Sequence, residues 1–296
     1  MKKLFVTLAA VICCTIAVSA QEGTPTAEQR NQKRKIVLNN VEYTHHDEKL
    51  SAGDAVGKIL TGVLTGQTSV QATQYEDDVK NGIVKGLSGA HLFLYDDGLL
   101  GAGGNAEEGA IVVNAVISNI QSKSDTRTWR DKEDKVQTST TYTGIVEAML
   151  TLKDAKTGKL IANPSLKGQG MGFSSSSTSE KAIREAIGRL SNNITAWLNK
   201  YRPLKANILE GATVKKTKQK EVYIDLGSSE GAYVGLHMGV YQVKIVAGRE
   251  AKTQIGKLKI EAIEGDDISL CKVQSGGKDI KASLDAGEKL VVQSID

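Results

Sequence analysis

The sequence lacks a recognisable catalytic constellation. Its four histidines are scattered, and its paired carboxylates stand at helix starts or turns, where solvation or capping explains them. These pairs are Asp77–Asp78, Asp96–Asp97 and Glu107–Glu108. No Ser/His/Asp or Cys/His set is indicated, so we expect a protein that is not an enzyme, with no catalytic residue, no cofactor and no metal site.

Cysteine is also scarce. Cys13 and Cys14 lie in the N-terminal apolar run, which leaves Cys271 as the remaining thiol. A single thiol has no intramolecular partner in an oxidising compartment, so disulfides are excluded as a source of stability. We expect packing to hold the fold together, with Cys271 as a buried thiol on a strand.

Positive charge exceeds negative charge only slightly. The formal net charge is +4, and Lys2 and Lys3 at the N-terminus contribute two of these charges. No basic cluster is interleaved with aromatic residues, which argues against a nucleic-acid binder. The short basic run Lys33–Lys35 is interpreted as a solvated edge, with contact to an anionic surface as the alternative.

The longest apolar run, Leu4–Val18, is too short for a typical membrane span. Its basic flank and the small residues before Gln21 predict a secretory signal peptide over residues 1–20. Lipidation of Cys13 or Cys14 is the alternative. The residues before these cysteines are not small, and an apolar stretch follows them, which favours the simple signal peptide.

Hydrophobic periodicity then predicts a flexible leader over residues 21–34 and a mixed α/β domain over residues 35–203. The expected strands are Lys35–Tyr43, His91–Tyr95, Ala110–Gln121 and Tyr142–Leu152, and the expected helices are Ser51–Gly66, Gln74–Gly86 and Glu180–Tyr201. The last helix has a capping box from Ser177 to Glu180 and stops before Pro203. A membrane-surface helix is the alternative for Ser51–Gly66.

Two loops carry residues that sometimes bind ligands. His45 and His46 could bind a metal, but neighbouring residues on an extended chain point in opposite directions, so we interpret them as part of a polar turn. The segment Gly98–Gly109 is glycine-rich, but a strand pattern follows it, whereas a phosphate-binding loop precedes a helix. We therefore expect a mobile loop there, with a nucleotide site as the alternative.

The stretch Ser122–Thr140 is polar throughout, between two strand patterns. It predicts either a long loop or the twisted, exposed end of a hairpin. Trp129 lies there among charges, and exposed tryptophan is favoured at interface hot spots. We therefore take Trp129, with Arg127 and Arg130, as candidate partner-binding residues; the alternative is that Trp129 folds back on the strands.

After Pro203 the pattern changes. Residues 206–296 contain short runs of β-forming residues, broken by Gly and Asp at spacings near ten residues, without a convincing helix. This pattern predicts a small antiparallel barrel or sandwich, and hence an α+β chain of two domains.

Two segments of the first domain, GAIVVNAVISNIQ (109–121) and IVEAMLTLKDAKTGKLI (145–161), resemble the curli-secretion-channel (CsgG-like) family. The resemblance implies a CsgG-like α/β sandwich and a periplasmic location at the outer membrane. It also implies envelope or outer-membrane proteins as partners, with homo-oligomers and peripheral membrane association among the alternatives. The segment VYIDLGSSEGAYVGLHMGVYQV (222–243) is similar to the C-terminal β-domain of the flagellar assembly protein FlgT.

The expected function is therefore that of a non-catalytic, periplasmic, outer-membrane-associated assembly or secretion protein. One alternative is a subunit of an oligomeric outer-membrane secretion pore. Membrane strands alternate apolar side chains over about ten residues, and Ser122–Thr140 does not. The other alternative is an activator of cell-wall synthesis like the LpoB lipoproteins, which share a related α/β domain.

Overall fold

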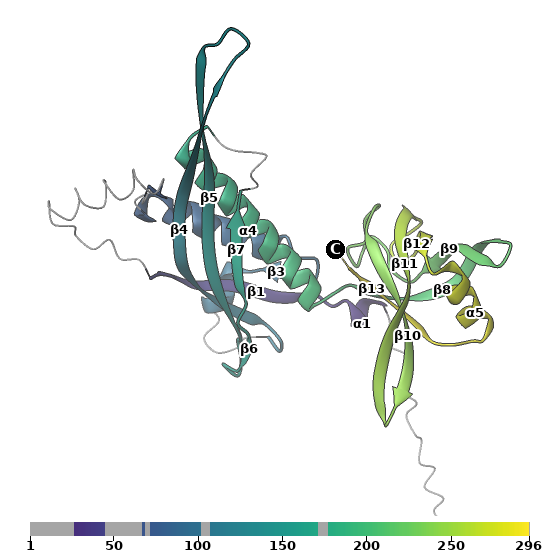
Figure 1. Ribbon diagram of the computed structural model, residues 1–296. Coiled ribbons are helices and arrows are strands. Elements are labelled where there is room, and N and C mark those ends of the chain that lie inside the picture. Colours follow the sequence, from purple (N-terminus) through teal and green to yellow (C-terminus); the bar gives the residue numbers. More distant parts are fainter. Residues whose placement is uncertain (1–26, 45–66, 69–71, 102–106, 171–176, 296) are drawn as a thin grey trace, which may run out of the picture.

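The computed structural model describes residues 27–44, 67–68, 72–101, 107–170 and 177–295. The predicted signal peptide, the histidine pair, the predicted helix Ser51–Gly66 and the centre of the glycine-rich loop lie outside these residues. The rest forms a mixed sheet with helices, followed by a closed barrel of six strands (Figure 1). The predicted α+β class is confirmed at this level.

The first domain is built on a seven-stranded sheet in the order β3-β1-β4-β5-β6, with β2 paired to β4 and β7 paired to β5. Its strands are β1 (Arg34–Tyr43), β2 (Gln67–Thr68), β3 (Phe93–Tyr95), β4 (Ile111–Arg130), β5 (Val136–Asp154), β6 (Leu160–Ala162) and β7 (Ser165–Gln169). β1 runs parallel to β3 and β4, and the remaining pairs are antiparallel. Alternate residues of β4 are buried, as expected for a strand covered mainly on one face.

Two long helices cover this sheet (Figure 1). They are α3 (Glu76–Ser88) and α4 (Ser179–Tyr201); the short helices are α1 (Ala27–Arg30), η1 (Ala72–Tyr75) and η2 (Asp97–Gly101). The two long helices approach closely because Gly86 of α3 faces α4, and Thr195 Oγ1 donates a hydrogen bond to the Gly86 carbonyl at 2.8 Å. The buried core lies between the helices and the sheet.

The start of α4 differs from the prediction by one residue. Thr178, not Ser177, is the N-cap, and its side chain accepts a hydrogen bond from the Lys181 amide. Glu180 therefore does not complete a capping box. It instead pairs with Arg184, one turn further along the helix, at 3.2 Å. The apolar stripe that the sequence predicts faces the sheet as expected.

The second domain is a closed antiparallel barrel in the order β10-β11-β12-β9-β8-β13. Its strands are β8 (Lys205–Lys215), β9 (Lys218–Ile224), β10 (His237–Val246), β11 (Arg249–Ile263), β12 (Ser269–Ser275) and β13 (Leu290–Ser294). One helix, α5 (Gly277–Asp285), stands between β12 and β13, so the prediction of an all-β domain is wrong at this point. α5 buries Ile280 in the barrel core, which explains why it forms.

The two domains share a contact region around residues 30–32, which the sequence assigned to the flexible leader. Residues 27–34 of that segment form α1 and the beginning of β1. The Asn31 side chain donates to the Lys205 carbonyl and accepts from the Lys205 amide, both at 2.8 Å. Arg30 forms an ion pair with Asp225 of the barrel. These contacts tie the chain before β1 to the start of β8 and to the residue that follows β9.

Candidate interaction site

The polar stretch between the two strand patterns is a two-stranded ribbon. β4 and β5 stay paired in register from Ser124↔Tyr142 to Arg130↔Val136. In the part of the chain that the structure describes, β2 pairs with β4 at Ser122 and Lys123, and β7 pairs with β5 from Ile145 onward. Residues 124–142, which we call the arm, thus extend beyond the described strands of the sheet as a projecting hairpin end (Figure 1). Of the two predicted forms, the hairpin is the one observed.

Threonines stabilise the arm because β-branched residues favour extended backbone and form cross-strand pairs. The Thr126 and Thr140 hydroxyls lie 2.9 Å apart, and those of Thr128 and Thr138 lie 3.4 Å apart. None of the buried core residues of the sheet lies in the arm. Among the described residues, cross-strand pairing is therefore the main support of this ribbon.

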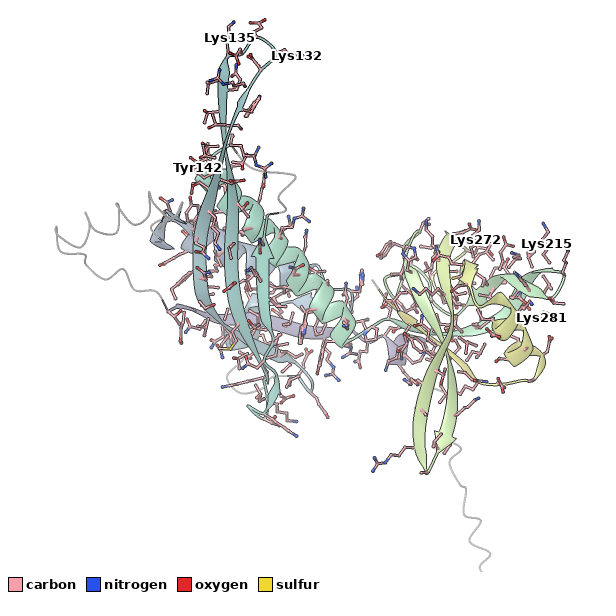
Figure 2. All side chains as sticks on the ribbon, viewed as in Figure 1. Lys132, Lys135, Tyr142, Lys215, Lys272 and Lys281 are labelled. Atoms are coloured by element: carbon pink, nitrogen blue, oxygen red, sulfur yellow. The ribbon has the colours of Figure 1, made fainter. Side chains whose placement is uncertain are left out.

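The tip of the arm is organised by Asp131. Its carboxylate accepts hydrogen bonds from the Glu133 amide at 2.9 Å, the Lys135 amide at 3.0 Å and the Gln137 side chain at 2.9 Å. These bonds, that of Gln137 first, hold the pKa of Asp131 below its ordinary value. Lys132 and Lys135 stand at the far end of the arm and Tyr142 at its base (Figure 2).

The structure separates the three candidate partner-binding residues. Side chains alternate along a strand, so Arg127 and Trp129 lie on one face of the arm and Arg130 lies on the other. The Trp129 side chain is 50% exposed, and Arg127 contacts Asp125 at 3.3 Å. Arg130 instead pairs with Asp134 at 3.0 Å. The candidate surface is therefore the face with Trp129 and Arg127.

Sequence reasoning missed Val136, an exposed apolar residue at the tip. It stands opposite Arg130, and its side chain is 61% exposed. The signal was its position as an isolated apolar residue directly after the charged run that makes the turn. It gives the second face of the arm a small apolar element of its own.

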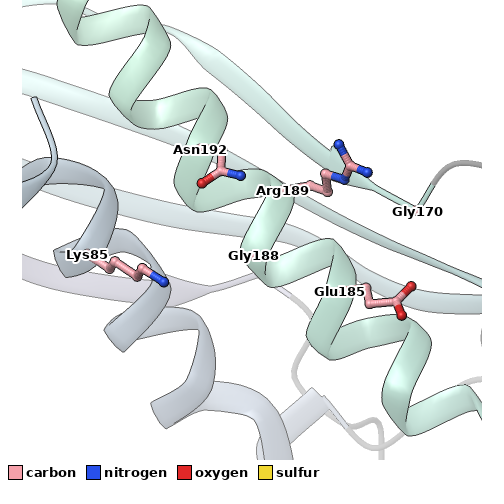
Figure 3. Close-up of a pocket in the computed structure, with 6 residues that line it drawn as sticks. All are labelled: Lys85, Gly170, Glu185, Gly188, Arg189 and Asn192. Atoms are coloured by element: carbon pink, nitrogen blue, oxygen red, sulfur yellow. The ribbon is translucent and has the colours of Figure 1, made fainter. Parts of the chain in front are cut away.

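The hollow between α3 and α4 shows no arrangement suited to catalysis. It has a volume of about 370 Å³ and is lined by Lys85, Gly170, Glu185, Gly188, Arg189 and Asn192. Arg189 extends toward Gly170 and away from Lys85, and Glu185 points outward from α4 (Figure 3). Because these charged groups do not converge on one point, we assign no reaction to this hollow.

The described residues contain no group of three or more His, Cys, Asp or Glu side chains that could hold a metal ion. Cys271 is buried in the barrel core, and burial raises the pKa of its thiol to about 12. A thiol with this pKa is not a nucleophile near neutral pH. Among the helices that the structure describes, none is long and apolar enough to cross a membrane.

The fold is thus that of an α+β protein with a mixed sheet and a closed barrel. No protein-family model matches the chain. No curated protein matches it either. Solved structures do resemble the chain, and the three named below have low TM-scores.

The solved structures that resemble parts of the chain include the following three. Hypothetical protein CT253 from Chlamydia trachomatis is 13% identical, with a TM-score of 0.30, over 57% of this chain and 95% of the other. Lipoprotein GNA1162 from Neisseria meningitidis is 13% identical, with a TM-score of 0.21, over 57% and 97%. A Helicobacter pylori homolog of neuraminyllactose-binding hemagglutinin is 7% identical, with a TM-score of 0.28, over 60% and 86%. These scores assign neither family nor function.

Proposed function

We propose that this protein is a non-catalytic periplasmic adaptor of the CsgG-like type, which docks on a protein assembly at the outer membrane. The proposal is supported by the predicted signal peptide and by the two first-domain segments that resemble the curli-secretion-channel family. The exposed arm supports it further, since it offers a surface that the sheet itself does not use.

The single observation behind the docking role is the face of the arm with Trp129 and Arg127. Tryptophan and arginine are the residue types most enriched at interface hot spots. An isolated two-stranded ribbon is only marginally stable in water, because it buries no core. Binding a partner would bury the Trp129 ring and fix the ribbon, so the arm gains order and apolar contact in the same step.

The arm favours an adaptor over a secretion-pore subunit. A strand that crosses a membrane turns apolar side chains to the lipid at every second position. In the arm, one face presents Asp125, Arg127 and Trp129, and half of the residues on the other face are threonines. Both faces are polar over most of their length, so neither matches a lipid-facing surface.

Photo-crosslinking in cells tests the proposal. A photoreactive residue at Ser139, beside Arg127 and on the face of Trp129, is expected to capture a specific outer-membrane protein. The same residue at Thr138, on the opposite face, is the matched control and should capture much less of it. Trp129→Ala should remove most of the product, since truncating a hot spot costs at least roughly 2 kcal/mol of binding.

The outcomes separate the three expected functions. Equal crosslinking from both faces, or no product from either, would contradict docking through the arm. Capture of a penicillin-binding protein would favour the activator of cell-wall synthesis. Detergent-dependent ring assemblies of the purified protein, seen by electron microscopy, would favour the pore subunit.

A further inference from the structure

The hairpin between β8 and β9 concentrates positive charge at one end of the barrel. Five lysines gather there, two at the end of β8 and its turn, two on β9 and one at the start of α5. They are Lys215, Lys216, Lys218, Lys220 and Lys278, which we call the basic end. All five are exposed, and Lys215 stands at the tip of the hairpin (Figure 2).

These lysines have no carboxylate partner among the residues that the structure describes. In the part of the chain that the structure describes, none of the five forms an ion pair. The nearby Lys272 and Lys281 differ, since they pair with Glu261 and Asp285. The tip of the arm differs as well, since Arg130 and Lys135 pair there with carboxylates.

The pairing of the hairpin makes the charge concentration locally unfavourable. Lys215 and Lys218 are directly opposite each other across the two strands, and Lys216 lies between them with a φ of +58°. Like charges directly opposite destabilise an antiparallel pair, and a non-glycine residue at positive φ adds strain. Sequences usually break such local rules where function requires it.

A hollow of about 420 Å³ joins the two parts of the basic end. Lys218, Gln219 and Lys220 line one side, and Gln219 is buried while the two lysines are exposed. Lys278 lines the other side, and Asp279 is the one carboxylate among the described lining residues. The glycines at the rim have a structural explanation, since a Cβ at Gly276 would lie 1.9 Å from the Ile255 carbonyl oxygen.

We propose that the basic end is the surface by which the barrel docks on a membrane that carries anionic, phosphate-bearing lipids. All five cations are lysines, which act as mobile point charges, whereas recognition of one fixed phosphate favours the bidentate fork of arginine. The charges stand on a projecting hairpin, a shape that suits a flat surface. Val214, 48% exposed beside Lys215, adds an apolar contact at headgroup level.

Nucleic acid fits the basic end less well than a lipid surface. The five lysines have no aromatic residue among them on which bases could stack. The inference goes beyond the proposed adaptor role and does not depend on it, because the arm belongs to the other domain.

Vesicle sedimentation of the secreted, signal-free protein tests the inference. The protein should bind vesicles of equal parts phosphatidylglycerol and phosphatidylethanolamine, and not vesicles of phosphatidylcholine alone. Each lysine near an anionic surface changes partitioning roughly fivefold at low salt. The triple variant Lys215→Gln, Lys218→Gln, Lys220→Gln should therefore bind roughly a hundredfold more weakly.

The matched control removes three exposed lysines from the first domain, as Lys153→Gln, Lys156→Gln, Lys159→Gln. It lowers the net charge equally and should bind within about twofold of the unaltered protein, since these residues lie outside the basic end. Thermal melts should show both variants folded. An equal loss in both variants, or no binding to the anionic vesicles, would overturn the proposal.

Two further measurements exclude other anions. Inorganic phosphate should displace the protein from vesicles no better than chloride at equal ionic strength; stronger displacement would indicate a single-phosphate site and overturn the surface proposal. Binding of a single-stranded oligonucleotide, lost in the basic-end variant while the vesicles are ignored, would overturn it in favour of nucleic acid. Trp129→Ala should bind vesicles normally, so the adaptor proposal can fail without this one.

Discussion

Gly144 of β5 and Gly168 of β7 determine how closely α4 approaches the sheet. A Cβ at Gly144 would lie 2.1 Å from the Ala182 carbonyl oxygen, and one at Gly168 would lie 2.0 Å from that of Ala186. Both obstacles are helix backbone, so they cannot move aside without shifting α4 as a whole. The absence of two side chains therefore positions α4, the longest helix among the described residues.

Replacing Gly144 by alanine should lower the free energy of unfolding by about 1–3 kcal/mol, the usual cost of overpacking a core. Chemical denaturation followed by circular dichroism measures this change. Gly188→Ala on the exposed side of α4 is the control, because a Cβ there meets nothing within 4 Å. It should stabilise the helix by about 0.5–1 kcal/mol, and destabilisation by both substitutions would argue against the close-contact explanation.

Cys271 makes the free energy of unfolding depend on pH in the alkaline range. Burial raises the pKa of its thiol from 9.0 to about 12, so the folded state keeps the proton that the unfolded chain loses first. This contribution is complete below pH 9 and is lost as the pH rises toward 12. Burial likewise raises the pKa of Tyr43 from 10.0 to about 12, which adds a second loss above pH 10.

The free energy of unfolding should therefore decrease between pH 9 and 10 in the signal-free protein, as measured by urea titration at each pH. Cys271→Ala should reduce this decrease, whereas Tyr43→Phe should retain it, because tyrosine begins to titrate later. A thiol reagent should also label Cys271 slowly in the native protein and rapidly in urea. Rapid native labelling would contradict the burial.

At the scale of secondary-structure elements, the arm combines long strands with little tertiary support. Its backbone pairing is with the other strand of the same ribbon, and it contributes none of the buried core residues. The inner part of β4 is different, since Ile111, Val113 and Ala115 are buried between β1 and β5. One strand therefore passes from a stable to a weakly held environment.

Hydrogen exchange should show this difference along a single strand. Amides of residues 124–130 should exchange orders of magnitude faster than those of residues 111–117, because the ribbon opens locally without unfolding the domain. Mass spectrometry of the native protein measures both segments at once. Addition of the purified partner identified by photo-crosslinking should slow exchange in the arm. Equal protection of both segments in the absence of a partner would contradict a marginally stable ribbon.

The elements that the sequence predicted best have long, regular apolar patterns. The helix expected over Glu180–Tyr201 is observed as Ser179–Tyr201, because its apolar stripe repeats over five turns and Pro203 follows it. The helix α5 was missed because nine residues give too short a pattern, with Ile280 as its one buried large apolar residue. The residue in the sequence that marks its start is Gly276. In the structure Gly276 has a positive φ, which ends β12 and allows the helix to begin.

The sequence predicted which residues form the candidate site but not on which face of the arm each one lies. The sequence singled out Trp129, Arg127 and Arg130, but their faces depend on whether the segment is extended and on its register. A β-bulge in β4 between Ile117 and Asn119 shifts this register before the arm begins. A bulge changes which side chains share a face, and residue types alone do not reveal it.

At the scale of the whole molecule, residues 30–32 fix the junction between the domains. The buried Asn31 side chain satisfies both backbone groups of Lys205, which would otherwise be left without partners at the start of β8. Arg202 also reaches back, and its guanidinium donates to the Gln32 carbonyl at 2.6 Å. The orientation of the barrel is thus held by contacts on both sides of the linker.

Asn31→Ala should lower the free energy of unfolding by about 1–3 kcal/mol, because it leaves buried polar groups unpaired. Small-angle X-ray scattering should also show a wider distribution of dimensions, since the domains then reorient more freely. Asn39→Ala is the control, because Asn39 is exposed and makes one side-chain hydrogen bond, to Asn114. Its effect should stay within about 0.5 kcal/mol, and equal effects would argue against the junction role.

Leu92, just before β3, gives the junction a further meaning. It belongs to the chain of the first domain, but it is buried to 1% exposure in the core cluster of the barrel. A barrel expressed without the first domain would have a cavity where the Leu92 side chain packs. Its free energy of unfolding should be lower by about 2–5 kcal/mol, as when a core leucine is truncated to alanine. The two domains follow one another in the chain but are not modular. An exchange of barrels between related proteins would succeed only if the residue at position 92 were exchanged with them.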